Sequence, residues 1–517
     1  MKRTTNALRN TLISFGSFIL IFLFGVGIRR LFLDNLSIEY LGYEGLFSNI
    51  FAVLSTLDLG AGSILLYRLY RAIAENSEGE IRKLLAMYAR LYRLVAGVVL
   101  LLGLAVIPLL PLLIRDEISD WNFVYLIYIM QLVTTVGVLY LSYYRLLLEA
   151  HQRVSDAVIV ETSIRIASQI LKVVVILYTK NYLIYLSVGL LYNLVSALLI
   201  SFRCRREFAS LLGGPFDKQY FKEGLFRSEL KNSSVIRLSQ TVFYLMDTLL
   251  VSSLIGLRAV ALYGNYTMIG GQVLMGFNAL LQPVRASAGN YANTETKEDS
   301  YRMFRIVDLI AFFLASFVLT SLFTLFQPTI SVIYGAQYLL PLSFLAFYSL
   351  YCYIIIKDNA IRMFRETVGE FKQEKMWSVT GAGVNIILSI IGVKLFGITG
   401  ILMGTFLSEL VLEAGSYFIA YRHRFQLPVR VGLGRTYVFL LLAAAEAGLT
   451  YLATSWIPVS FGGLALRCVF CLVVPNGLNA LLFRKTEAFA RMLGYVKKML
   501  FILKNRGNPP EETAAAE

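Results

Sequence analysis

Ionisable side chains lie inside several apolar segments of this 517-residue chain, where they are the first candidates for chemistry. The clearest set lies on the segment 157–179, which carries Glu161, Arg165, Ser168 and Lys172. At about 100° per residue these side chains fall within about 60° of one another on a helix. Charged groups at membrane depth are costly and rarely face lipid. This face therefore lines either a cavity that accepts an anion or a seam of ion pairs. The absence of a carboxylate beside Lys172 favours the cavity.

Two further apolar segments carry polar side chains at helical spacing. These are Arg237, Gln240 and Asp247 on the segment 233–256, and Asp58 on the segment 45–67. Arg237 and Gln240 have the chemistry to contact a polar or anionic substrate. The two aspartates are candidates for binding a coupling ion, Na⁺ or H⁺. The alternative is that each aspartate is the counter-ion of a neighbouring arginine or lysine.

Two more charged pairs lie at or within predicted spans. Arg29 and Arg30 lie at the outer end of the segment 12–33, where they either bind an anionic substrate or extend to the membrane surface. Glu409 and Glu413 lie one helical turn apart, and we interpret them as structural pairing residues.

The sequence shows none of the residue combinations by which catalytic or metal-binding sites are commonly recognised. The chain has two histidines, His151 and His423, and neither has a second plausible metal ligand near it in the sequence. Cys468 and Cys471 form a C-x-x-C within an apolar segment without a partner pair, which favours packing over zinc or redox chemistry. No nucleotide-binding or hydrolase motif is present. We therefore expect no catalytic residues, no metal, no resident cofactor and no enzymatic activity.

The composition shows which elements must position these side chains. Hydrophobic residues make up 57% of the chain and charged residues 16%, whereas a typical soluble protein has about 25% charged residues. So much apolar sequence predicts an all-α polytopic membrane protein. About fourteen segments have spanning length: 12–33, 45–67, 91–114, 122–144, 157–179, 182–202, 233–256, 259–284, 306–327, 336–356, 377–395, 397–420, 436–457 and 462–483.

The basic residues give the predicted membrane protein an orientation. With the N-terminus inside, 39 of the 48 lysines and arginines lie in inner connections and only 6 in outer corners. Because cytoplasmic loops collect Lys and Arg, both termini are predicted to be cytoplasmic. The same rule explains the net charge of +15 without nucleic acid as a partner. The N-terminal apolar segment is longer than the core of a signal peptide and is predicted to be retained as the first span.

The long basic connection after the sixth span predicts two lobes. A faint repeat supports a six-plus-six duplication, because glycine and aromatic residues precede both the second and the eighth span. The predicted divisions are an N-lobe at 1–202, a cytoplasmic basic linker at 203–232, a C-lobe at 233–421, an extra helix pair at 422–484 and a cytoplasmic tail at 485–517.

Several sequence blocks resemble one family of membrane proteins. They are IEYLGYEGLFSNI at 38–50, LSTLDLGAGS at 54–63, LYRLYRAIAE at 66–75, ARLYR at 89–93, LYGNYTMI at 262–269, QPVRASAGN at 282–290 and KLFGITGILMGTFLS at 394–408. With these blocks the chain resembles the polysaccharide-biosynthesis branch of the multidrug/oligosaccharidyl-lipid/polysaccharide (MOP) superfamily. The most similar group is the bacterial O-antigen and capsule-type lipid-linked oligosaccharide flippases.

The resemblance implies a MATE-like fold in which two six-helix lobes flank a central, often cationic cavity. It also implies export of an undecaprenyl-diphosphate-linked oligosaccharide by alternating access, in the cytoplasmic membrane of a bacterium. Lys172 and Arg165 would then anchor the anionic head group, with Glu161 tuning them. Related flippases keep basic residues on the first helix, whereas Arg29 and Arg30 occupy only its outer end here.

Three other interpretations remain open from the sequence. A drug/cation antiporter of the same superfamily would prefer an acidic or aromatic cavity, which the basic face at 157–179 disfavours. A membrane glycan polymerase or ligase would carry a larger outer loop with acidic or histidine residues. An assembly scaffold for a glycan-synthesis complex is compatible with the sequence. The expected partners are the lipid-linked oligosaccharide, membrane lipids, and glycan polymerase or glycosyltransferase proteins.

Overall fold

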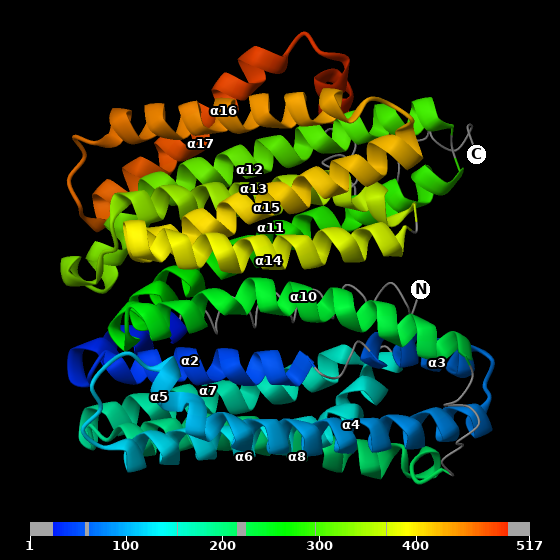
Figure 1. Ribbon diagram of the computed structural model, residues 1–517, viewed down its shortest axis with the longest axis vertical. Coiled ribbons are helices and arrows are strands. Elements are labelled where there is room, and N and C mark those ends of the chain that lie inside the picture. Colours follow the sequence, from blue (N-terminus) through cyan, green and yellow to red (C-terminus); the bar gives the residue numbers. More distant parts are fainter. Residues whose placement is uncertain are drawn as a thin grey trace. The chain divides into compact units, whose positions relative to one another are not determined.

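The computed structural model describes residues 24–56, 61–151, 153–214, 224–294, 296–368 and 370–494. Within these ranges every regular element is helical, and helix occupies most of the described part of each of the fourteen predicted spans (Figure 1). The prediction of an all-α fold is therefore confirmed. Residues 24–35 are helical at the start of the described chain. The labelled α-helices that follow are α2 (Glu39–Ser55), α3 (Ala61–Ala74), α4 (Glu78–Val106), α5 (Leu110–Leu113), α6 (Trp121–Ala150), α7 (Val154–Tyr178), α8 (Tyr182–Glu207), α10 (Gly224–Leu254), α11 (Leu257–Thr294), α12 (Lys297–Ile333), α13 (Leu342–Glu366), α14 (Phe371–Phe396), α15 (Ile398–Ile419), α16 (Val429–Thr454) and α17 (Phe461–Phe483).

Nine helical stretches within the described ranges are long and apolar enough to cross a membrane. Many of their large apolar side chains are exposed, and Leu101 on α4 is 68% exposed. Such a surface is stable only against lipid or another apolar partner. The chain is therefore a multi-pass membrane protein. The helix α7 is not one of the nine stretches, and it carries four charged residues, Asp156, Glu161, Arg165 and Lys172.

Side-chain caps fix the start of several of these helices. Asp120 accepts a hydrogen bond from Phe123 N at 3.2 Å where α6 begins. Asn181, Thr296 and Ser460 cap α8, α12 and α17 in the same way. Each oxygen satisfies a backbone N–H that has no partner within its helix.

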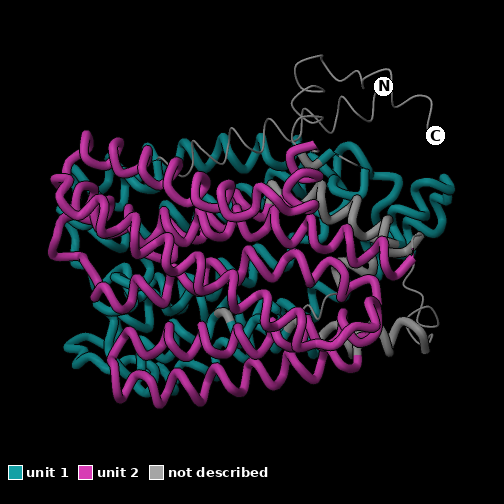
Figure 2. Tube along the Cα trace, turned by 90° about the horizontal axis from the view of Figure 1, so that it is seen from above, with its two compact units in different colours: residues 1–265 teal, residues 266–517 magenta. Residues whose placement is uncertain are grey.

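The chain divides into two compact units, residues 1–265 and 266–517, which are distinguished by colour in Figure 2. The division falls inside α11. The lobe, linker and tail boundaries predicted from the sequence remain a prediction.

In the first unit, α6 packs against both α4 and α8. One buried apolar core at the ends of these helices contains Tyr88, Tyr143, Leu147 and Cys204. One glycine of the sequence block at 38–50, Gly42, is required by the packing of two helices. A Cβ at Gly42 would lie 2.8 Å from Leu257 Cβ, so only glycine allows α2 to approach the start of α11 this closely.

In the second unit, α12, α13 and α15 form the buried centre, with α16 and α17 packed on α12. The helices α14 and α15 lie side by side along their length (Figure 1). Gly392 and Gly400 face each other across this pair, and a Cβ on either residue would overlap the carbonyl group of the other.

We therefore expect Gly392→Ala to destabilise the second unit by about 1–3 kcal/mol, because the backbones would have to move apart. Thermal unfolding of the detergent-solubilised protein measures the effect. Gly383→Ala on the same helix is the matched control, because its Cβ would meet nothing within 4 Å. The control is expected to be neutral or slightly stabilising, since alanine is the better helix former. Equal loss of stability in the two variants would contradict the close contact.

Candidate functional site

The charged side chains on one face of α7 contact different partners. Glu161 pairs with Arg145 of α6 at 2.9 Å. Arg165 is exposed, and its guanidinium lies 6.0 Å from the ring centre of Tyr192 on α8. These two predicted binding residues therefore contact different neighbouring helices, Glu161 with α6 and Arg165 with α8, and their substrate role remains a prediction.

Lys172 lies deeper along α7 against α8. Its ammonium group is 4.4 Å from the ring centre of Tyr185, a cation–π contact. Gly189, one turn further along α8, makes room for this ammonium group, because a Cβ there would lie 2.8 Å from Nζ. Two features of α8 thus position the Lys172 side chain.

A carboxylate from another helix completes this environment. Glu44 on α2 interacts electrostatically with Lys172 and with Arg29. Glu44 also interacts with the hydroxyl-bearing ring of Tyr185, as does Arg29. Sequence reasoning missed Glu44, although it stands as the only carboxylate within the LGYEGL corner. Lys172 therefore has a carboxylate nearby, which the helical pattern of α7 alone could not reveal.

Arg29 is held by the start of α11. It donates to the side-chain oxygen of Asn265, and its Nη2 donates to the carbonyl oxygen of Ala261 at 3.3 Å. Arg30, in contrast, pairs with Asp34 at 2.8 Å on the surface, with both side chains 43% exposed. The two arginines thus lie in different environments, and only Arg29 lies beside Glu44 and Asn265.

We define the unit 1 charge cluster as Arg29, Glu44, Lys172, Tyr185 and Asn265. Its ionisable groups are two cations and one carboxylate, an arrangement that favours an additional anion. An aromatic wall stands beside it. The rings of Tyr40 and Tyr182 stack with centres 4.2 Å apart, and Phe32 meets Tyr185 at 5.0 Å.

The candidates on α10 are spread along the helix. Asp247 is 2% exposed, and Tyr263 donates to one of its oxygens at 3.3 Å. Gln240 is exposed. The side chain of Arg237 lies outside the described residues, as does Asp58 entirely. A coupling role for the two aspartates remains a prediction.

The second unit buries two charged side chains, Asp308 and Lys357, that the sequence analysis did not single out. Asp308 on α12 pairs with Lys357 on α13 and with Arg435 on α16, the second at 3.1 Å. The side chains of Asp308 and Lys357 are almost fully buried, at 1% and 0% exposed. Glu413 on α15 lies close enough to interact with Lys357. These charges tie four helices of the second unit together.

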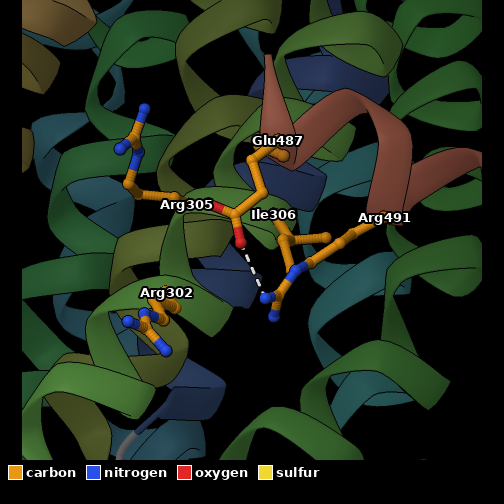
Figure 3. Close-up of a pocket in the computed structure, with 6 residues that line it drawn as sticks. Arg302, Arg305, Ile306, Glu487 and Arg491 are labelled. Carbon is orange, nitrogen blue, oxygen red and sulfur yellow. Dashed lines mark ion pairs between the residues drawn. The ribbon is translucent and has the colours of Figure 1, made fainter.

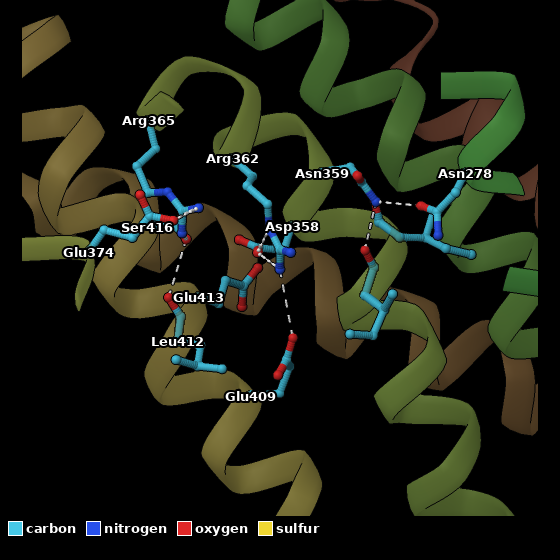
Figure 4. A network of polar contacts seen from close by, with 12 residues as sticks. Asn278, Asp358, Asn359, Arg362, Arg365, Glu374, Glu409, Leu412, Glu413 and Ser416 are labelled. Atoms are coloured by element: carbon cyan, nitrogen blue, oxygen red, sulfur yellow. Dashed lines mark hydrogen bonds and ion pairs between the residues drawn. The ribbon is translucent and has the colours of Figure 1, made fainter. Parts of the chain in front are cut away.

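A neighbouring network, shown in Figure 4, involves the predicted pairing residue Glu409. Arg362 pairs with Asp358 one turn away at 2.6 Å and reaches Glu409 at 3.8 Å. Arg365 pairs with Glu374 at 2.9 Å and donates to Ser416 at 3.2 Å. A structural role for Glu409 fits these contacts between α13 and α15.

A small cavity in the second unit is not a substrate site. It lies between α12 and the helical residues 487–494 and has a volume of about 40 Å³. That volume holds only a few water molecules. The labelled side chains in Figure 3 are Arg302, Arg305, Ile306, Glu487 and Arg491, with Glu487 and Arg491 paired at 2.6 Å.

Among the described residues, no group of three or more His, Cys, Asp or Glu side chains could hold a metal ion.

The arrangement of helices is similar to that of known transporters. The solved structure of the lipid II flippase MurJ in an inward closed conformation matches 92% of this chain and 99% of its own, with a TM-score of 0.69 and 13% identity. The chain shares its fold with these proteins. An inward-facing multidrug resistance MATE family transporter of the MOP superfamily matches 80% of this chain and 95% of its own, with a TM-score of 0.63 and 13% identity.

An outward-facing MATE transporter of the MOP superfamily gives a TM-score of 0.55 at 14% identity over 84% of this chain and 96% of its own. The predicted MATE-like fold is therefore confirmed. No family model matches the sequence. No curated protein matches it either. At these identities the likeness concerns the fold.

Proposed function

We propose that this protein is a flippase that exports an undecaprenyl-diphosphate-linked oligosaccharide across the cytoplasmic membrane of a bacterium by alternating access. The single observation that supports this most is the unit 1 charge cluster, in which two cations, Arg29 and Lys172, interact electrostatically with the one carboxylate of Glu44. A surplus of positive charge beside aromatic rings suits a diphosphate joined to a sugar.

The contacts suggest how such a head group would bind. Lys172 is a compact point charge over the ring of Tyr185, and Arg29 offers a planar fork of donors. An arriving diphosphate would compete with Glu44 for both cations. The Glu44 carboxylate would offset part of the charge of both cations after the substrate leaves, which allows release as well as binding. Arg165, Arg237 and Gln240 would contact the head group at other stages, with Glu161 tuning Arg165.

Energy coupling is the second element of the proposal. Asp247 is buried beside the Tyr263 hydroxyl, and Asp58 belongs to the predicted span 45–67. Either carboxylate could bind Na⁺ or H⁺, which would drive the return step. The proposal includes cytoplasmic termini, lipid contacts and glycan polymerase or glycosyltransferase partners.

Reconstitution of the purified protein in liposomes tests the function directly. The substrate is an undecaprenyl-diphosphate-linked oligosaccharide placed in one leaflet, and an impermeant reagent reports the sugar that reaches the other leaflet. We expect the protein to speed this appearance well above the rate in protein-free liposomes. Equal rates with and without protein would contradict the proposal.

The MATE neighbours make a drug/cation antiporter the specific alternative. Ethidium efflux that depends on Asp247 would favour that function over lipid-linked sugar transport. Deletion of the protein in cells separates a flippase from a glycan polymerase. Loss of a flippase leaves the unpolymerised lipid-linked repeat on the inner leaflet, whereas loss of a polymerase leaves it on the outer leaflet.

A further inference from the structure

A large cavity opens in the first unit away from the charge cluster. It has a volume of about 660 Å³ and lies among α4, α6, the end of α8 and the chain that follows α8. The residues that line it are Leu85, Ala86, Ala89, Arg90, Arg93, Tyr143, Tyr144, Arg205, Leu212, Gly213 and Gly214. This volume is large enough for a small organic ligand, unlike the 40 Å³ cavity of the second unit.

The lining is basic. It contains three arginines, and none of the residues that line it is acidic. Arg93 hydrogen-bonds the Tyr143 hydroxyl, and its guanidinium lies 5.4 Å from the ring centre of Tyr140. Arg205 donates to the Tyr144 hydroxyl at 2.7 Å.

These contacts orient the guanidinium groups without neutralising them. Neither Arg93 nor Arg205 forms an ion pair with a described residue. Phenol hydroxyls and aromatic rings hold a planar guanidinium in place while its charge remains available. Arg93 and Arg205 at one cavity therefore form a site for a phosphate, which arginine recognises with paired donors.

The surface around the cavity indicates where the phosphate comes from. Leu94 follows Arg93 and is 63% exposed, and Leu101, two turns further along the same helix face, is 68% exposed. Phe202, three residues before Arg205, is 66% exposed. The basic lining thus passes directly into the apolar surface that faces lipid. This is the geometry of a head group above its acyl chains.

We propose that this cavity binds the phosphate head group of an anionic phospholipid at the predicted cytoplasmic surface. Its acyl chains lie along the exposed faces of α4 and α8. The site is separate from the unit 1 charge cluster, so it does not depend on the proposed flippase activity. A soluble phosphate shares the chemistry, but it gains nothing from the apolar surface beside the arginines.

Lipid titration of the full-length protein in detergent tests this site. Short-chain phosphatidylglycerol is the probe, and phosphatidylcholine and inorganic phosphate are the comparison arms. The thermal unfolding midpoint at each concentration gives an apparent affinity. We expect phosphatidylglycerol to stabilise the protein at concentrations where the other two have little effect. An equal effect of inorganic phosphate would overturn the lipid assignment.

Substitutions locate the binding. Arg93→Gln and Arg205→Gln are each expected to weaken phosphatidylglycerol about tenfold, equivalent to about 1.4 kcal/mol, and the double variant more. Arg206→Gln is the matched control, because Arg206 is exposed, adjacent in sequence and not part of the lining. If the double variant does not fold, the two single variants carry the test. Unchanged affinity in these variants, or an equal loss in Arg206→Gln, would overturn the proposal.

Discussion

Replacing Lys172 with glutamine is expected to reduce transport of the lipid-linked oligosaccharide at least about tenfold. A hydrogen bond to a charged group is worth about 1.5–3 kcal/mol, and about 1.4 kcal/mol corresponds to tenfold in binding. Lys172 is held over the ring of Tyr185 and interacts electrostatically with Glu44, so its charge is already placed when substrate arrives. Initial rates in liposomes over a range of substrate concentrations measure the loss.

Two further variants separate substrate binding from structural pairing. Lys180→Gln is the control on charge alone, because Lys180 is exposed just beyond the end of α7. The double variant Lys172→Gln with Glu44→Gln removes the internal pair together. If Lys172 only neutralises Glu44, the double variant regains transport. If Lys172 anchors the substrate, the double variant stays impaired although it is well folded, and full recovery would reject the anchor.

The helices were predictable because spanning a membrane imposes a local requirement. Each span must be apolar over about 20 residues and satisfy its own backbone, so the signal lies within one segment. The ends were less predictable. The helix α12 covers Lys297–Ile333 although the predicted span is 306–327, because the polar residues 297–305 are also helical and precede the apolar part.

Because sequence patterns report relations within one segment, they did not reveal the partners that α7 residues find on other helices. Helical phase placed Glu161, Arg165 and Lys172 near one face of α7, since that relation is fixed within one helix. Their partners come from elsewhere. Arg145 belongs to α6 and Glu44 to α2, and only tertiary packing brings them to α7.

The ion pairs of Asp308 in the second unit were not predicted because the positions of their cations were ambiguous in the sequence. Lys357 and Arg435 stand at the edges of the apolar segments, where a cytoplasmic loop assignment is the ordinary interpretation. The structure extends α13 to Glu366 and begins α16 at Val429, so both residues lie within helices. Because one Asp, one Lys and one Arg come from three distant segments, no spacing in the sequence connects them.

Replacing Asp308 with asparagine is expected to lower the free energy of unfolding by about 3–5 kcal/mol. This is the usual cost of removing one partner from a buried ion pair. The Asp308 carboxylate is 1% exposed and serves both Lys357 and Arg435. Asparagine keeps the shape but leaves two cations close together without this anion. Unfolding in mixed micelles, followed by circular dichroism, measures the loss.

Asp299→Asn on the same helix provides the matched comparison. Its side chain is 36% exposed and lies 3.7 Å from Arg302, so solvent screens the pair and the expected loss is below about 1 kcal/mol. Adding Lys357→Met to Asp308→Asn should restore part of the stability, because the buried ammonium is then removed as well. If Asp308→Asn is no more harmful than Asp299→Asn, this ion pair does not hold α12 to α13. If the double variant is less stable than Asp308→Asn alone, Lys357 is neutralised by another carboxylate, and Glu413 is the nearest candidate.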